Sequence, residues 1–124
     1  MNKLWFRSIT ALIAVALVSP LAVQAGSKKS YNGMTEDAAL DILVRRIKQD
    51  NVYAKRISLD CVTYITEETT RTYFEFALRE KHGGKCSGDP DASPIIDRYR
   101  VNRASGKIEL YDAVNDRWLD YKKS

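Results

Sequence analysis

Histidine and cysteine are scarce in this 124-residue chain, which contains one histidine, His82, and two cysteines, Cys61 and Cys86. A Ser/His/Asp catalytic site would have to use His82 with a neighbouring serine and either Asp89 or Asp91. This histidine lies in a glycine-rich stretch without the Gly-x-Ser-x-Gly pattern of a nucleophile elbow. We therefore expect no catalytic residues, no metal site and no cofactor, and predict that the protein is not an enzyme.

Paired acidic residues give equally little support for a cation site or a glycoside hydrolase. Asp89 and Asp91 flank a proline, and two carboxylates are too few for Ca²⁺, which takes about six or more oxygen ligands. Glu67 and Glu68 are adjacent in a polar run, so their side chains should point apart instead of facing across a cleft. We interpret both pairs as turn residues.

A concentrated block of basic residues is also missing. The formal net charge is +4, and lysines and arginines are dispersed among acidic residues. Lys3 and Arg7 belong to the signal peptide predicted below, so its removal lowers the net charge to +2. Because nucleic-acid binding usually needs a basic patch on one face, we expect no nucleic-acid partner.

The first 25 residues have the organisation of a secretory signal peptide. Lys3 and Arg7 precede an apolar run over residues 9–23, and small residues stand before Gly26. A membrane anchor is the alternative, but the run is shorter than the roughly 20 residues that span a bilayer. We expect cleavage before Gly26, membrane contact only before cleavage, and a periplasmic or secreted bacterial protein.

The two cysteines both lie in the predicted mature chain. In an oxidising compartment an isolated pair most often forms a disulfide. A metal site or a catalytic thiol is the alternative, and a metal site usually needs more nitrogen or sulfur ligands than the chain offers. We therefore predict one disulfide between Cys61 and Cys86.

A single amphipathic helix is predicted after a flexible lead-in over residues 26–34. Thr35 can cap the helix, with acidic residues in its first turn, and the pattern continues to about residue 49. Apolar residues recur at the spacing of one helical face: Leu40, Leu43, Val44 and Ile47.

Four strands are predicted downstream. Apolar and polar residues alternate over 57–65 and 74–78, with a polar turn at 67–70 between them, which favours a hairpin. A glycine- and proline-rich loop over 82–94 follows, and then two shorter strands. The tail after residue 111 is less regular. Residues 35–124 should therefore form one α+β domain with the helix packed on a four-stranded antiparallel sheet.

This order of elements resembles PepSY-like domains. The resemblance rests on Glu36-Asp-Ala-Ala39 at the start of the helix and on the later hairpin sequence Tyr99-Arg-Val-Asn-Arg-Ala-Ser-Gly-Lys-Ile-Glu-Leu-Tyr-Asp112. Its most specific part is the turn Ser105-Gly106-Lys107. The resemblance implies an extracytoplasmic, non-catalytic module associated with peptidase propeptides and peptidase inhibition.

The loop over 82–94 is the first candidate for contact with a partner. Long ordered loops are uncommon in compact domains and are often functional. Its candidate contact residues are His82, Lys85, Asp89 and Asp91. A purely structural connection between two strands is the alternative.

Two tyrosines are further candidates, because tyrosine is enriched at binding surfaces. Tyr64 and Tyr73 should lie on the outer face of the first hairpin. We expect a secreted binding module whose partner is a cell-envelope protein, such as a peptidase or another hydrolase that it inhibits, with immunity-type inhibition included. The alternative is a small-molecule, lipid or metal binder that uses the concave sheet face, lined by Phe74, Phe76 and Tyr99.

Overall fold

The computed structural model describes residues 33–122. The predicted signal peptide over 1–25 and residues 26–32 of the predicted lead-in lie outside the described residues. The elements, in chain order, are the helix α1 (Glu36–Gln49), the 3₁₀ turn η2 (Leu59–Cys61) and the strands β1 (Val62–Thr69), β2 (Tyr73–Glu80), β3 (Ile95–Asn102), β4 (Ile108–Asp112) and β5 (Arg117–Asp120).

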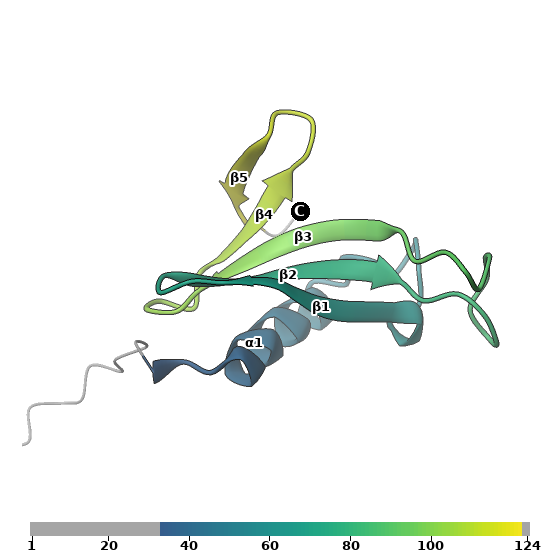
Figure 1. Cartoon of the computed structure of the whole chain (residues 1–124), viewed down its shortest axis with the longest axis horizontal. Coiled ribbons are helices and arrows are strands. Elements are labelled where there is room, and N and C mark those ends of the chain that lie inside the picture. The colour runs from purple at the N-terminus through teal and green to yellow at the C-terminus, as the bar shows by residue number, and fades with distance from the viewer. Residues whose placement is uncertain (1–32, 123–124) are drawn as a thin grey trace, which may run out of the picture.

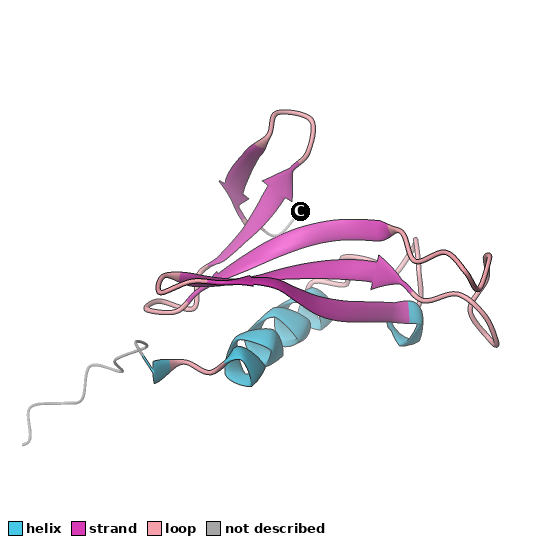
Figure 2. Ribbon diagram, in the orientation of Figure 1, coloured by secondary structure: helices cyan, strands magenta, loops and turns pink. Residues whose placement is uncertain are grey.

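The strands form one antiparallel sheet in chain order, with α1 packed against β2 and β3. Figure 1 shows α1 on one side of the sheet and the β4–β5 hairpin standing away from the helix. Figure 2 shows the same layers by secondary structure. The predicted α+β class is confirmed.

The sheet has five strands instead of the predicted four, because the irregular tail forms β5. The Asp112 carboxylate accepts the backbone N–H groups of Val114 and Asn115, and Asp116 adopts a left-handed φ of 49°. These features reverse the chain, so that Trp118 pairs with Tyr111 in β4. Local side-chain hydrogen bonding of this kind favours turns without any apolar periodicity.

The first strand is displaced toward the C-terminus relative to the prediction. Ser58 accepts the backbone N–H of Asp60 at 3.4 Å and begins η2, so the alternating residues before Val62 are not extended. The strand then runs through the predicted turn as far as Thr69, with a bulge between Thr66 and Glu68. The chain reverses instead at 70–72.

The helix begins as the sequence predicts. The Thr35 hydroxyl accepts the backbone N–H of Ala38 at 3.2 Å, which satisfies one of the free donors of the first turn. Ala39, Leu43 and Ile47 are buried against the sheet. Within residues 33–122, no helix is long and apolar enough to cross a bilayer.

The core lies between α1 and the inner face of the sheet. Met34, at the end of the predicted lead-in, is also buried there, with 8% of its surface exposed. The largest fully buried side chains are Tyr99, Phe76, Leu43, Ile47, Leu78 and Val101.

A chain of phenol hydroxyls crosses this core. The Tyr53 hydroxyl donates to an Asp97 carboxylate oxygen at 2.5 Å and lies 2.6 Å from the Tyr99 hydroxyl. Because the Tyr53 proton is used on Asp97, Tyr99 is the donor to Tyr53. Burial is the main cause that raises the pKa of both phenols above 10. The neutral phenols therefore join the loop after α1 to β3.

Replacing Tyr53 tests this network. Tyr53→Phe leaves Asp97 and Tyr99 without their shared partner, so we expect the free energy of unfolding to fall by about 1.5–3 kcal/mol. Tyr64→Phe is the matched control, because the Tyr64 hydroxyl makes no hydrogen bond within residues 33–122. Urea unfolding curves should separate the two variants. Equal losses would contradict a stabilising role for the hydroxyl chain.

Candidate partner-binding site

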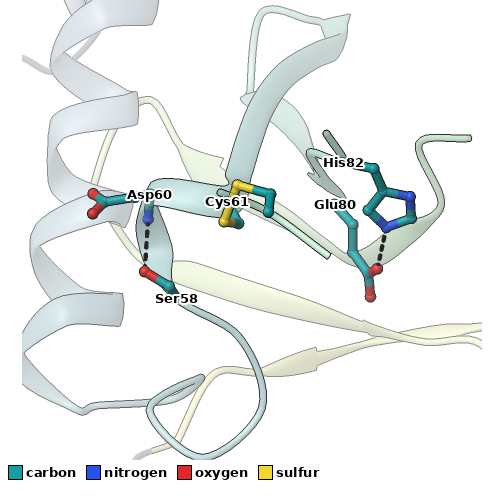
Figure 3. The surroundings of a disulfide bond; sticks show 6 residues. Ser58, Asp60, Cys61, Glu80 and His82 are labelled. Atoms are coloured by element: carbon teal, nitrogen blue, oxygen red, sulfur yellow. Dashed lines mark hydrogen bonds and ion pairs between the residues drawn. A yellow bond between two sulfur atoms is a disulfide. The ribbon is translucent and has the colours of Figure 1, made fainter. Parts of the chain in front are cut away.

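The predicted disulfide between Cys61 and Cys86 is confirmed. The two Cα atoms lie 5.6 Å apart, and the bond joins the end of η2 to the loop over 82–94, here called the tethered loop. In Figure 3, Ser58 and Asp60 lie on one side of this bond, and Glu80 and His82 lie on the other. The bond therefore holds together two segments that are 25 positions apart in the sequence.

Backbone hydrogen bonds order the tethered loop at both ends. At its base, the Glu80 N–H donates to the Pro94 carbonyl at 2.9 Å, and the Lys81 N–H donates to the Cys61 carbonyl at 2.8 Å. Nearer its middle, Gly83 and Cys86 exchange two backbone hydrogen bonds of 2.9 and 3.0 Å. The loop thus has a defined conformation before any partner is bound.

His82 supports the loop from inside. Its Nε2 lies 2.7 Å from a Glu80 carboxylate oxygen, and its Nδ1 lies 2.9 Å from the Asp89 carbonyl oxygen. Only 10% of the side chain is exposed. Both neighbours are acceptors, so the doubly protonated ring satisfies both, and the bond to Glu80 is the main cause that raises the pKa of His82 above 6.5.

Gly88 allows this histidine to reach its partners. The Gly88 φ is +112°, a conformation that other residues rarely adopt. A Cβ atom at this position would lie 2.6 Å from His82 Nδ1. Glycine is therefore required at position 88 both for the backbone turn and for the close approach of the ring.

The other candidate residues of the loop face solvent. Lys85, Asp89 and Asp91 are exposed. The Asp89 carboxylate accepts the backbone N–H of Asp91 at 2.9 Å, so Asp89 shapes the loop as well as its surface. The four predicted loop residues therefore lie in one loop but differ in exposure. The His82 side chain points into the loop, whereas the side chains of Lys85, Asp89 and Asp91 face solvent.

Tyr64 and Tyr73 do not share a face, so the expected outer position of Tyr64 is wrong. Tyr64 pairs with Leu78 and packs against the core, whereas Ile65 is on the outer face and is 42% exposed. The sequence alternation before Val62 is interrupted by η2, so it does not determine which residues of β1 face the helix. Tyr73 lies on the outer face, where the Arg100 guanidinium is 4.0 Å from its ring centroid.

A cation–aromatic stack on this helix-free face was missed by sequence reasoning. Arg100 lies 4.0 Å from the ring centroids of both Tyr73 and Trp118, and its guanidinium pairs with Glu75 at 3.0 Å. Arginine, tyrosine and tryptophan are the residue types most often found at binding hot spots. The only sequence signal is the strand alternation that places Arg100 outward, because β5 supplies Trp118 from outside the predicted strands.

The described residues do not assemble the catalytic or metal sites that were weighed above. Both nitrogens of His82 are held by Glu80 and Asp89, and the Ser93 hydroxyl donates to the Glu80 carbonyl at 2.9 Å. No group of three or more histidine, cysteine, aspartate or glutamate side chains in residues 33–122 is placed to hold a metal ion.

Comparison with known proteins identifies no relative: no family model, no curated protein and no solved structure matches this chain. The site must therefore be interpreted from its own geometry.

The disulfide should make a large contribution to stability. In the chain-entropy description, closing a loop of this length stabilises the fold by about 3 kcal/mol. We expect the double substitution Cys61→Ala/Cys86→Ala to lower the melting temperature by roughly 10 °C or more. Differential scanning calorimetry measures the effect, and the reduced wild type should behave like the variant. An unchanged melting temperature in both would contradict this role.

The loop should be most strongly held when His82 is charged. Because the folded-state pKa is raised, the stabilisation is fully present below the unfolded pKa of 6.5 and is lost as the pH rises through the folded-state value. We expect the stability difference between wild type and His82→Gln to be larger at about pH 5.5 than at about pH 8.5. NMR titration of this single imidazole should give a pKa above 6.5. A pKa at or below that value would rule out the proposed hydrogen-bond arrangement.

Proposed function

We propose that this protein is a secreted, non-enzymatic binding module that contacts a cell-envelope protein through its tethered loop. The preferred partner is a peptidase or another hydrolase that it inhibits, including a toxin neutralised by immunity-type inhibition. The observation that carries the proposal is a disulfide-tethered loop whose backbone is ordered from within while Lys85, Asp89 and Asp91 face solvent.

Preorganisation is the physical reason to favour binding by this loop. A flexible loop loses conformational entropy when a partner immobilises it, and a loop that is already ordered avoids most of that cost. The disulfide, the hydrogen bonds at the base and the hydrogen bonds of the partly buried His82 all order the loop before binding. An oxidising compartment, which the disulfide suggests, fits a periplasmic or secreted location.

Binding of a small molecule or lipid on the inner sheet face is less favoured. Phe74, Phe76 and Tyr99 were expected to line such a cavity, but they are 3%, 0% and 1% exposed and pack in the core under α1. The inner face is therefore filled by the helix, and a ligand there would have to displace it. The PepSY-like resemblance points to the same kind of inhibitory module and stays a prediction.

Substitution in the loop tests the proposal once a partner is available. The tagged mature protein is used to capture proteins from an envelope extract, and each captured protein is purified and assayed directly for affinity and for loss of hydrolase activity. We expect Asp91→Ala to weaken binding by about tenfold or more, as for a contact near the centre of an interface. Its melting temperature should match that of wild type, because the Asp91 side chain is exposed.

Asp37→Ala is the matched control, because Asp37 is an exposed carboxylate on α1. It should bind like wild type. If Asp91→Ala, Asp89→Ala and Lys85→Ala all bind as tightly as wild type, the tethered loop is only a connection and the proposal fails.

A further inference from the structure

The tethered loop stands beside two adjoining hollows on the surface. One has a volume of about 680 Å³ and is lined by Lys81, His82, Lys85 and the disulfide, among others. The other has a volume of about 310 Å³ and is lined by Arg56, Ser87 and Glu80 together with residues of the first. Both hollows share Ser58, Cys61, Lys81 and Lys85. We call the joined surface the basic cleft, defined by Arg56, Ser58, Lys81, Lys85 and Ser87.

We propose that the basic cleft binds the carboxylate side chains of an acidic segment of the partner protein. This inference rests on the proposed function, since it assigns a chemistry to the partner that the tethered loop contacts. It adds a second binding region. Of the contact residues predicted from the sequence, only Lys85 and His82 line the two hollows.

The cations of the cleft have no acidic partner among residues 33–122. Arg56, Lys81 and Lys85 make no ion pair with any residue in the part of the chain that the structure describes. On the helix-free face, by contrast, Arg98 pairs with Glu67 at 2.7 Å, and Arg100 pairs with Glu75. The arginines of the sheet are neutralised within the fold, and the cations at the foot of the loop are available to a ligand.

The acidic residues of the cleft do not cancel this charge. Glu80 is engaged by His82, which is itself a cation when protonated. Asp60 is the other carboxylate on the lining, so two acids face three permanent cations and one titratable imidazole. The net charge of the cleft is therefore positive.

Hydroxyl groups complete a set of donors for a carboxylate. The Ser58 oxygen accepts the Asp60 N–H, which leaves the Ser58 hydroxyl hydrogen free to donate. Ser87 offers a second hydroxyl on the same lining. Ammonium, guanidinium and hydroxyl donors gathered in one cleft match an anionic oxygen ligand.

The position of the cleft favours an acidic protein segment over a free anion. Lys85 belongs to the tethered loop and to both hollows, so a partner that covers the loop also covers the cleft. The larger hollow has room for a side chain and its neighbours, in the range of ordinary ligand pockets of about 300–1,000 Å³. Opposite charge across such an interface speeds association and selects the partner.

Titration with a model peptide tests the cleft without the partner. An N-acetylated, C-amidated tetraglutamate peptide is added to the ¹⁵N-labelled mature protein, with tetraglutamine as the uncharged peptide and inorganic phosphate as the free anion. We expect tetraglutamate to shift the amide signals of Ser58, Lys81, Lys85 and Ser87, and the effect to weaken as salt rises. Tetraglutamine should have no effect, and phosphate should bind more weakly than tetraglutamate.

Charge reversal supplies the matched comparison. The double substitution Lys81→Glu/Lys85→Glu should weaken tetraglutamate binding by about tenfold or more, because it replaces two attractive charges by two repulsive ones. Arg71→Glu is the control, since Arg71 is exposed in the turn between β1 and β2, at the other end of the sheet from the tethered loop. A melting temperature close to that of wild type establishes that a variant is folded. If the charge-reversal variant is not folded, Lys81→Gln/Lys85→Gln is used in its place.

Three results would overturn the inference: no shifts in the cleft, equal weakening by Arg71→Glu, or phosphate binding as tightly as tetraglutamate. The first two show that no specific anion site exists, and the third shows a site for small anions only. Failure of the proposed function is distinguished by Asp91→Ala, which lies outside the cleft lining. If Asp91→Ala weakens binding of the captured partner and the Lys81→Glu/Lys85→Glu substitution does not, the tethered loop contacts the partner and the basic cleft does not.

Discussion

The covalent link between Cys61 and Cys86 is the constraint on which the end of the molecule that carries the tethered loop depends. The segments that it joins, η2 and the tethered loop, contribute no fully buried side chain to the core, and Leu59 of η2 packs against the core while partly exposed. Burial of apolar surface therefore stabilises these two segments less than it stabilises α1 and the sheet. A bond that restricts the unfolded chain compensates for this lack of buried surface. The sheet supplies a rigid base, and the disulfide fixes the polar tethered loop to that base.

Polar interactions of two kinds occur in different parts of the molecule: hydrogen bonds in the core and ion pairs on the helix-free face of the sheet. In the core, the buried Tyr53 and Tyr99 hydroxyls satisfy their hydrogen bonds with each other and with the partly buried Asp97, as buried polar groups must. On the helix-free face, arginine and glutamate side chains from β1, β2 and β3 are paired. Around the tethered loop, Arg56, Lys81 and Lys85 line two adjoining hollows without an ion pair to any described residue. The proposal that a partner approaches the end of the sheet that carries the loop rests on this local arrangement more than on the total charge of the chain.

The features that sequence reasoning could predict are those set by local periodicity or by residue count. The spacing of Leu40, Leu43 and Ile47 specified α1, and two cysteines left a single pairing. The fifth strand was missed because its existence depends on side-chain hydrogen bonds from Asp112. The face of Tyr64 depends on where β1 begins, and a strand displaced by one residue exchanges its two faces. Contacts between distant strands, such as Arg100 with Trp118, leave no local pattern.

The close approach of Gly88 to His82 has a consequence for how this protein can diversify. Position 88 admits no side chain, and positions 61, 82 and 86 are occupied by internal contacts, so substitutions there are expected to be eliminated by selection. Positions 85, 87 and 91 carry exposed side chains without a role in holding the backbone. Mutations at these positions can alter charge and shape at little cost in stability. The exposed surface of the loop can therefore change over evolutionary time while the same fold is kept.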